Sequence, residues 1–458
     1  MSEQVQWSAA LVKKYDGNGP RYTSYPTALC FEQVTQAQYL SALSQAGRSY
    51  EPLSLYVHIP FCRHLCYYCA CNKHVTKQQD LADKYIEHLA IEMSRLADFC
   101  GARPIKQLHF GGGTPTFLTV EQMQRVWALL DYNFDLFSLP DHEFSIEIDP
   151  RVTDENYLAM LKELGFNRIS IGVQDFNPAT QKAVHRVQPY ELVAQRMQAA
   201  RDLGFHGISI DLIYGLPNQS EATFEQTLRQ VLDLSPDRIA MYSYAHLPDR
   251  FAPQKRIDSH EVPTPETKLA ILGNSIQQLQ SAGMVYIGMD HFAKPDDPLA
   301  QALYGQSLQR NFQGYSTHKG LDMLAMGVSS ISFIDGQYFQ NEKSLDAWQN
   351  KIAAGEMPVA KGYELNDDDI RRRWIISRLS CAMPISYSEY RKEFGRNFLA
   401  DFKDVQPYLQ NFADDGLIKL SAKGIDVLPT GRLLLRPICM LFDAYLTDQL
   451  RQRYSRIV

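Results

Sequence analysis

The chain has 458 residues, and at about 150 residues per domain this length allows one large domain or up to about three. Hydrophobic residues make up 45% of it and charged residues 21%, which excludes a wholly disordered, collagen-like or coiled-coil chain. The net charge of -6 gives no overall attraction to nucleic acid or to an anionic membrane. Because the sequence shows neither a signal-peptide layout nor an apolar run of membrane-spanning length, we expect a cytoplasmic protein.

From about residue 50, short runs rich in β-branched residues alternate with helix-length segments. The predicted strands cover residues 53–59, 107–110, 143–148, 168–173, 207–213, 238–244 and 285–289. Helices are predicted between them, for example over 79–99 and 190–203. This alternation is typical of an α/β fold, in which helices cover a parallel sheet.

The two ends of the chain depart from this rhythm. Near the N-terminus, residues 19–27 are rich in Pro, Tyr and hydroxyl side chains, and such a segment needs a surface to lie on. After residue 362 the pattern changes to mostly helices. We therefore predict an N-terminal segment (1–50), a helix-covered sheet with an extension (51–362) and a small C-terminal domain (363–458).

The C-terminal domain is predicted to be helical or winged-helix-like, with helices over 367–379, 386–394 and 398–412 and a hairpin of 417–420 with 425–428. A winged helix can bind DNA. Residues 363–458 hold 15 Lys and Arg against 13 Asp and Glu, however, and show no basic stripe. A face that contacts phosphates normally has a strong positive excess, so we predict no nucleic-acid partner.

Four of the 8 cysteines crowd into one loop directly after the first predicted strand. Structural zinc usually takes two separated pairs, and here only Cys66 and Cys69 form a Cys-x2-Cys pair. The Cys-x3-Cys-x2-Cys spacing that starts at Cys62 instead lets three thiolates hold three irons of a 4Fe-4S cluster, with the fourth iron open. Cys71 is a fourth ligand, an active-site thiol or a buried small residue. The remaining cysteines are interpreted as structural: Cys30, Cys100, Cys381 and Cys439.

Polar residues also gather where the predicted strands end. Gly111–Gly113 follow the second strand, Glu147 lies on the third, Gln174 ends the fourth and Asp211 interrupts the apolar fifth. The alternatives are a simple tight turn for the glycines and a structural salt bridge for Asp211. Ligand sites of barrels and open α/β sheets occupy this rim, so we predict a site there.

The cysteine motif and its flanking residues resemble the radical S-adenosylmethionine (SAM) superfamily. The resemblance implies a partial (β/α)6 barrel in which Cys62, Cys66 and Cys69 ligate a 4Fe-4S cluster. SAM would occupy the open iron, and one electron would cleave it to methionine and a 5′-deoxyadenosyl radical. The glycine run matches the motif that holds the SAM amino group, and Glu147 matches a residue near its aminocarboxyl region.

A closer resemblance, to the oxygen-independent coproporphyrinogen III oxidase family, extends over nearly the whole chain. It rests on Cys71 and on residues 19–27, 145–150, 172–176, 211–217, 287–293, 310–315 and 326–329. It implies oxidative decarboxylation of two propionates of coproporphyrinogen III to vinyl groups, which gives protoporphyrinogen IX in heme biosynthesis. The N-terminal segment would lie over the active site.

The same resemblance implies two SAM molecules and assigns residues to each. The cluster-bound SAM would contact Tyr56, Gly112, Glu147 and Ile331. The second would contact Tyr68, Gly113, Thr114, Gln174, Arg186, Asp211 and Ala245. Candidates for the reaction centre are Tyr56, Cys71, Phe312 and Gln313. The alternative for Arg186 is a surface arginine. Arg21 is predicted to bind a substrate propionate, with a capping or hinge contact as its alternative.

The expected partners are coproporphyrinogen III, an electron donor and an electron acceptor, and we expect a monomer. The sequence identifies neither electron partner. Two other functions remain as alternatives. A heme-binding chaperone of the same superfamily is disfavoured by Cys71 and the N-terminal segment. A zinc- or nucleic-acid-binding protein is disfavoured by the lone Cys-x2-Cys pair and by the charge balance of the C-terminal domain.

Overall fold

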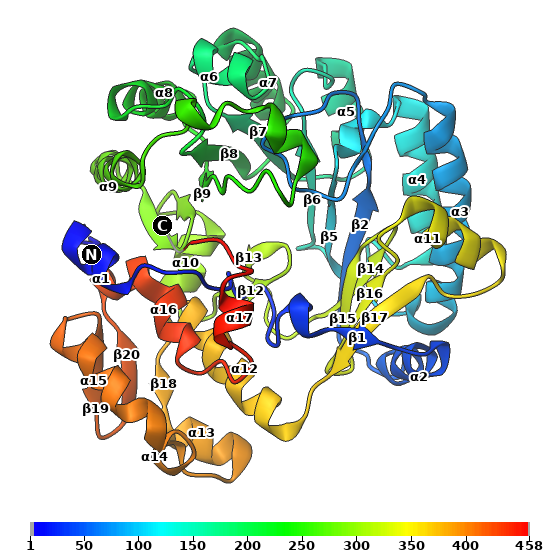
Figure 1. The fold of residues 1–458 in the computed structure, drawn as a ribbon. Helices are drawn as coiled ribbons and strands as arrows, with labels where there is room; N and C mark the ends of the chain where they lie inside the picture. Colours follow the sequence, from blue (N-terminus) through cyan, green and yellow to red (C-terminus); the bar gives the residue numbers. More distant parts are fainter. Residues whose placement is uncertain (1–3, 457–458) are drawn as a thin grey trace.

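A long curved sheet runs through the computed structural model, which describes residues 4–456 (Figure 1). Within those residues the strand order is β1-β17-β16-β15-β14-β2-β5-β6-β7-β8-β9-β11-β10. The central strands are parallel to one another. They are β14 (Asp322–Met326), β2 (Leu53–Ile59), β5 (Ile105–Gly112), β6 (Glu143–Ile148), β7 (Arg168–Gln174), β8 (Ile208–Tyr214) and β9 (Arg238–Ser243).

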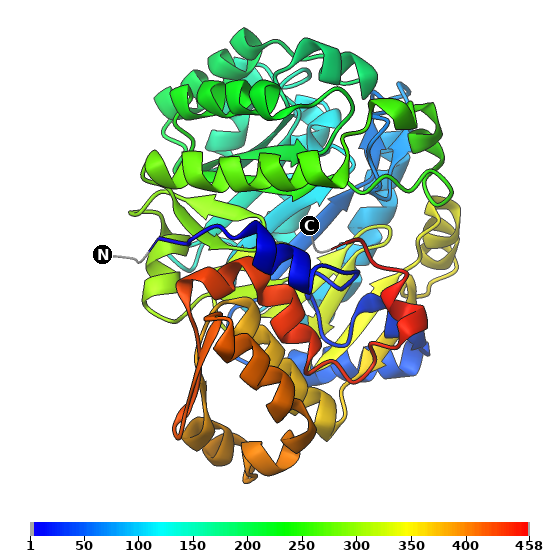
Figure 2. The same cartoon turned by 60° about the vertical axis from the view of Figure 1, so that its left-hand side comes forward.

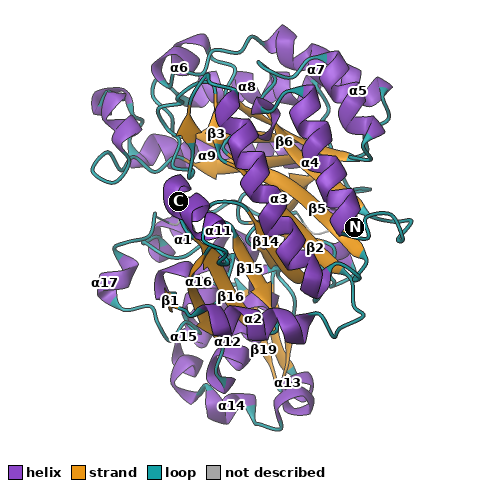
Figure 3. Cartoon of the chain, turned by 90° about the vertical axis from the view of Figure 1, so that its right-hand side faces the viewer, coloured by secondary structure: helices purple, strands orange, loops and turns teal. Residues whose placement is uncertain are grey.

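Helices connect these strands and cover the outer face of the sheet; α3 and α4 lie across β2 and β5 in Figure 3. They are α3 (Asp80–Cys100), α4 (Val120–Asn133), α5 (Glu155–Glu163), α6 (Pro178–Ala183), α7 (Tyr190–Asp202), α8 (Glu221–Asp233) and α9 (Pro265–Ser281). Thr119 and Ser220 begin α4 and α8 with reciprocal capping boxes. The six predicted strands from residue 53 to residue 244 are confirmed as the parallel strands β2 and β5 to β9.

The two edges of the sheet are antiparallel, which the sequence did not predict. One edge is β15 (Ile331–Ile334), β16 (Gln337–Asn341), β17 (Val359–Glu364) and β1 (Glu32–Gln33); the other is β11 (His291–Ala293) and β10 (Val285–Gly288). The seventh predicted strand, 285–289, is therefore present as β10 but does not continue the parallel array. The physical reason is a two-residue turn, since strands joined by so few residues form a hairpin.

Smaller elements complete this part of the chain. β3 (Phe61–Cys62) pairs with β4 (His74–Val75), and β12 (Gln309–Asn311) forms a hairpin with β13 (Gly314–Ser316). The remaining helices are α1 (Ala9–Tyr15), α2 (Gln36–Ala46), α10 (Pro298–Tyr304) and α11 (Leu345–Ala353). No helix of the described residues is both long enough and apolar enough to cross a membrane.

The C-terminal residues form a small helical unit around a short sheet. Its strands are β18 (Ile385–Ser386), β19 (Ile418–Ser421) and β20 (Gly424–Val427), and its helices are α12 (Asp367–Ser380), α13 (Tyr387–Phe394), α14 (Phe398–Asp401), α15 (Gln406–Asp414), α16 (Leu435–Met440) and α17 (Asp448–Arg451). The single helix predicted over 398–412 is wrong. It is broken between α14 and α15, because Pro407 cannot donate the backbone hydrogen bond that a continuous helix needs.

The N-terminal segment packs on the C-terminal unit and lies between it and the barrel (Figure 2). Val12, Tyr22 and Tyr25 belong to one hydrophobic core with residues of α12 to α16. The Tyr22 hydroxyl donates to Asp443 at 3.0 Å, and the Tyr25 hydroxyl accepts from the Ala444 amide at 3.0 Å. The domain division stays a prediction. Its boundary at 362 falls within β17, and residues 1–3 and 457–458 of the two end segments lie outside the described residues.

Candidate active site

A cavity of about 270 Å³ lies at the carboxyl ends of the parallel strands. Loops after β2 and β5, and residues at the ends of β6, β7 and β8, supply its walls. Most of the predicted site residues line it: Cys62, Cys66, Tyr68, Cys69, Cys71, Gly112, Gly113, Thr114, Glu147, Gln174, Arg186 and Asp211. The rim that the sequence predicted as a site is therefore one continuous surface.

The cysteine loop is pinned at both ends. The backbone amide of His74 donates to the Pro60 carbonyl at 2.7 Å, and that of Thr76 donates to the Cys62 carbonyl at 3.0 Å. Between these ends the loop holds Cys62, Cys66, Cys69 and Cys71 as free thiols. Burial raises the pKa of Cys62 to about 11. A hydrogen bond from Cys71 to the Cys69 sulfur lowers the pKa of Cys69 below its usual range and raises that of Cys71.

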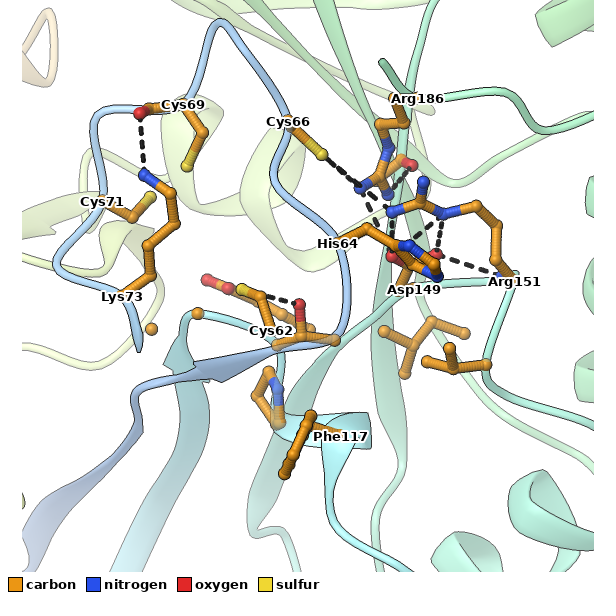
Figure 4. Close-up of a pocket in the computed structure, with 18 of the residues that line it drawn as sticks. Cys62, His64, Cys66, Cys69, Cys71, Lys73, Phe117, Asp149, Arg151 and Arg186 are labelled. Carbon is orange, nitrogen blue, oxygen red and sulfur yellow. Dashed lines mark hydrogen bonds and ion pairs between the residues drawn. The ribbon is translucent and has the colours of Figure 1, made fainter. Parts of the chain in front are cut away.

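The buried Arg186 and Asp149 and the half-buried Arg151 stand beside Cys66 (Figure 4). Arg186 Nη1 lies 3.6 Å from the Cys66 sulfur and 3.4 Å from Asp149 Oδ2. Arg151 Nη2 lies 4.0 Å from the same sulfur and 2.6 Å from Asp149 Oδ2. Although burial opposes ionisation, the charges of Arg186 and Arg151 lower the pKa of Asp149 to about 2. Arg186 is only 8% exposed, so the surface-arginine alternative is wrong.

The glycines at the end of β5 are needed because the backbone passes close to its neighbours. A Cβ on Gly113 would lie 2.6 Å from the Pro60 carbonyl oxygen. Gly112 has φ +121°, and a Cβ there would lie 2.7 Å from the His58 ring. The Gly113 amide donates to the Ile59 carbonyl at 2.8 Å, which fixes the loop against the end of β2. The run therefore does more than make a tight turn, since its bare backbone forms part of the cavity wall.

Two carboxylates face the interior of the barrel. Burial, and next the charge of Glu147, raise the pKa of Asp211 to about 7. Asp211 Oδ2 accepts a hydrogen bond from the Ser170 hydroxyl at 3.1 Å. Among the described residues it forms no ion pair, so the structural-salt-bridge alternative for Asp211 is wrong. Glu147 Oε1 lies 3.4 Å from His109 Nε2.

Three predicted residues, Tyr56, Ala245 and Ile331, do not line this cavity. The Tyr56 ring stacks on His109 with centroids 5.9 Å apart. The Ala245 carbonyl accepts a hydrogen bond at 3.3 Å from Gln254, whose side chain also reaches the Tyr68 carbonyl. Ile331 is the first residue of β15. Their predicted contacts with SAM stay predictions.

Phe312 and Gln313, predicted at the reaction centre, and Arg21, predicted for the substrate, do not line the cysteine cavity, whereas Cys71 does. Gln313 lines a neighbouring cavity of about 150 Å³, and Phe312 lines a third cavity of about 400 Å³. Arg21 forms an ion pair with Asp290 and stands 5.5 Å from the Tyr242 ring centroid. That contact corresponds to the capping or hinge alternative, and the propionate-binding role of Arg21 stays a prediction.

Among the residues that line the cysteine cavity and that the sequence analysis did not single out are Lys73, Arg151 and Tyr242. Lys73 Nζ donates to the Cys69 carbonyl at 2.9 Å. The position of Lys73, two residues after Cys71, could have marked it as a site residue. Arg151 could have been found from its position close to the predicted polar residues of β6. Tyr242 lies on the predicted strand 238–244, and the alternation of side chains along β9 could have placed it on the inner face.

Comparisons with known proteins decide the family. Residues 56–231 match the model of the radical SAM superfamily. The chain is 45% identical to an oxygen-independent coproporphyrinogen III oxidase of Pseudomonas aeruginosa, over 100% of both chains. It is 46% identical to the enzyme of the same name from Salmonella typhimurium, again over 100% of both chains. The chain belongs to the oxygen-independent coproporphyrinogen III oxidase family. It is therefore a radical SAM oxidoreductase, as the sequence predicted.

A solved structure of coproporphyrinogen III oxidase from Escherichia coli, described as a radical SAM enzyme, agrees with this family assignment. Its TM-score is 0.92 at 44% identity, and the match covers 97% of this chain and 100% of that one. The predicted α/β barrel fold with its N-terminal segment and C-terminal unit is therefore confirmed.

The cofactors of the radical SAM superfamily are a 4Fe-4S cluster and SAM, and the cavity suits both. Cys62, Cys66 and Cys69 share one loop and one cavity, and the guanidinium groups of Arg186 and Arg151 lie 3.6 and 4.0 Å from the Cys66 sulfur. Within residues 4–456, no three His, Cys, Asp or Glu side chains converge as the ligands of a single ion would. A cluster in which each thiolate binds a different iron does not need that convergence.

Proposed function

We propose that this chain catalyses the oxidative decarboxylation of two propionates of coproporphyrinogen III to vinyl groups, giving protoporphyrinogen IX in heme biosynthesis. One observation carries the proposal: full-length identity of 44 to 46% to relatives named for this activity, with the cysteine loop at the mouth of the barrel. The hydrogen at a propionate β-carbon is not acidic, so no side-chain base can remove it near neutral pH. When bound, the cluster and SAM supply a 5′-deoxyadenosyl radical, which removes it as a hydrogen atom.

The residues of this chain hold and orient the reactants. Cys62, Cys66 and Cys69 hold the cluster, and the Gly112–Gly113 backbone leaves room for a ligand to lie against β5. The barrel interior continues from the cysteine cavity past Glu147, Ser170, Asp211 and Tyr242, which line both this cavity and the next. A substrate can therefore approach the cysteine end from inside the barrel. This arrangement needs no acid–base pair from the protein for the hydrogen abstraction.

The same chain is proposed to bind two SAM molecules. The first would contact Tyr56, Gly112, Glu147 and Ile331, and the second Tyr68, Gly113, Thr114, Gln174, Arg186, Asp211 and Ala245. The contribution of residues from both sets to one cavity supports this proposal. Equilibrium dialysis of the anaerobic, iron-loaded protein with labelled SAM should give two SAM per chain. A stoichiometry of one would contradict the second set.

Four residues are proposed to act near the reacting atoms: Tyr56, Cys71, Phe312 and Gln313. Cys71 is the nearest of them to the cluster ligands, since its thiol hydrogen-bonds to Cys69. Gln313 lines the middle cavity, and its amide donates to the Met323 sulfur at 3.5 Å. A Gln313→Ala variant should keep its iron and its SAM while losing turnover. Unchanged turnover would remove Gln313 from the reaction centre.

The chain is further proposed to work as a cytoplasmic monomer, with one electron donor for the cluster and one acceptor for the electron that the substrate loses. One chain supplies every residue of the proposed site, and its cysteines are free thiols, as expected in a reducing compartment. Size-exclusion chromatography with light scattering checks the monomer.

The test of the activity is anaerobic incubation of the reconstituted protein with coproporphyrinogen III, SAM, a reductant for the cluster and an electron acceptor for the substrate electron. We expect CO2, 5′-deoxyadenosine and protoporphyrinogen IX. A protein with a full complement of iron that forms none of these products would refute the proposal.

A further inference from the structure

A cavity of about 400 Å³ lies beneath the N-terminal segment, on the far side of the barrel interior from the cysteine loop. Its walls come from residues 22–25, from the region of β12 to β15 and from α12. Its lining combines aromatic side chains, among them Tyr22, Phe312, Phe333 and Trp374, with polar and charged ones. Aromatic walls with convergent polar groups are typical of a small-molecule site.

This cavity adjoins the site already described through shared wall residues. It shares Gln107 and Asn311 with the middle cavity of about 150 Å³. The middle cavity in turn shares Glu147 and Asp211 with the cysteine cavity. The three spaces therefore adjoin in a row, and a ligand longer than one of them can extend from the cysteine end into the cavity under the N-terminal segment.

Arg373 of α12 presents a cation to this cavity. Its Nε donates to the Tyr338 hydroxyl at 3.2 Å, and its guanidinium stands 4.1 Å from the Phe333 ring centroid. These two contacts fix the plane of the group. Its terminal nitrogens have no hydrogen-bond partner and no carboxylate among residues 4–456. A guanidinium held in this way is preorganised to accept a carboxylate through two parallel hydrogen bonds.

Arg310 of β12 repeats the same arrangement on another wall. Its Nε donates to the Arg21 carbonyl at 3.3 Å, and its guanidinium stands 4.7 Å from the Tyr315 ring centroid. Its Nη1 is buried and has no hydrogen-bond partner within the described part of the chain. A buried donor without a partner costs free energy, which a ligand carboxylate would recover.

The charges of the cavity favour an anion. Arg310, Lys319, Arg373 and Arg378 line it, and among the described lining residues only Glu393 is acidic. The Arg378 charge is already balanced by Glu389, 2.7 Å away. Arg310 and Arg373 are thus the lining arginines whose charges no described carboxylate balances, in contrast to Arg21 with its partner Asp290.

We propose that the cavity under the N-terminal segment is a carboxylate subsite, in which Arg310 and Arg373 bind propionates of the porphyrinogen that are not at the reaction centre. The proposal rests on the proposed function for the identity of the ligand. A substrate with four propionates has to present one carboxylate arm at a time to the cysteine end. Fixed cations at the opposite end would hold the macrocycle in the orientation that does so.

The test compares Arg373→Gln and Arg310→Gln with Arg371→Gln. Arg371 lies on the same helix as Arg373, is paired with Asp368 and does not line the cavity, so it is a control with the same change of charge. Each cavity variant should raise the KM for coproporphyrinogen III by about 10- to 100-fold, the effect of losing one charge-assisted hydrogen-bonded contact. Iron content and SAM binding should match the wild type. Arg373→Lys, which keeps the charge but not the fork, should recover part of the loss.

A binding measurement separates this proposal from the proposed function. Fluorescence titration uses the stable probes coproporphyrin III, with four carboxylates, and mesoporphyrin IX, with two. The wild type should prefer the tetracarboxylate, and both cavity variants should lose that preference. Variants that keep the wild-type KM and the wild-type preference would overturn the carboxylate subsite. A wild type that prefers the tetracarboxylate but releases no CO2 would refute the proposed function and leave the subsite standing.

Discussion

Asp149→Asn is the change that tests most directly how the protein holds its charges beside Cys66. The Asp149 carboxylate is 6% exposed and binds Arg151 through Nε and Nη2, at 2.9 and 2.6 Å. The same carboxylate lies 3.4 Å from Arg186 Nη1. The substitution keeps the size of the side chain and removes its charge, so that the buried Arg186 and the half-buried Arg151 lose their shared partner.

The magnitude follows from the pKa. The arginines overcome the opposing effect of burial and lower the pKa of Asp149 from 3.8 to about 2. That difference corresponds to about 2 kcal/mol of stability at neutral pH. Because the pKa is lowered on folding, the contribution is present above about pH 4 and is lost as the pH falls toward 2. The unpaired arginines add to the loss, so we expect Asp149→Asn to cost about 3 kcal/mol.

The assay is urea unfolding at neutral pH under anaerobic conditions, comparing midpoints between proteins with the same slope. Asp141→Asn serves as the matched control, since its carboxylate pairs with Lys106 but is 75% exposed, and we expect no measurable change. Asp149→Asn should also weaken SAM binding, because Arg186 loses one of the contacts that orient it. A variant with the wild-type midpoint and wild-type SAM binding would refute this account of the Asp149 cluster.

Three further predictions concern the same cavity. The proposed cluster ligands are Cys62, Cys66 and Cys69. Serine in place of any one of them should abolish iron binding, whereas Cys71→Ser should keep its iron. Iron analysis after reconstitution checks both expectations, and an equal loss of iron in Cys71→Ser would make Cys71 a fourth ligand. Gly113→Ala should cost about 1–3 kcal/mol in urea unfolding and impair SAM binding, because its Cβ would lie 2.6 Å from a backbone oxygen. Gly17→Ala is the control: a Cβ at Gly17 would have no atom within 4 Å, so neither the free energy of unfolding nor SAM binding should change. The pKa of Asp211 is raised to about 7, so its carboxyl group ionises as the pH rises through 7. Because the ionised carboxylate attracts cationic SAM, the SAM affinity of the wild type should rise over the same pH range. A pH-independent affinity in dialysis, or the same rise in Asp211→Asn, would argue against this role.

Local pattern was enough to predict the parts of the fold that repeat. Strands β2 and β6 have the predicted bounds because each is a short apolar or alternating run between clear helices. The parallel strand β14 and the antiparallel strands β15 to β17 were missed because their runs are short and separated by turns. The partner of β14 is β2, which lies some 270 residues away in sequence, and nothing local marks such a pairing.

The site, too, has a part that local motifs predicted and a part that they could not predict. Cysteine spacing and glycine runs are local motifs, and they identified residues that line one cavity. Pairings between distant residues could not be predicted, such as Arg21 with Asp290 or the shared contacts of Arg151 and Arg186 with Asp149. They depend on which loops the barrel brings together. The separation of Phe312 from the cysteine cavity also depends on tertiary packing.

The central claim is that the radical removes hydrogen from a propionate of the substrate. It is tested by turnover of coproporphyrinogen III deuterated at the propionate β-carbons, followed by mass spectrometry of the 5′-deoxyadenosine. We predict deuterium in the 5′-deoxyadenosine together with loss of CO2. Unlabelled 5′-deoxyadenosine formed alongside decarboxylated product would contradict the account.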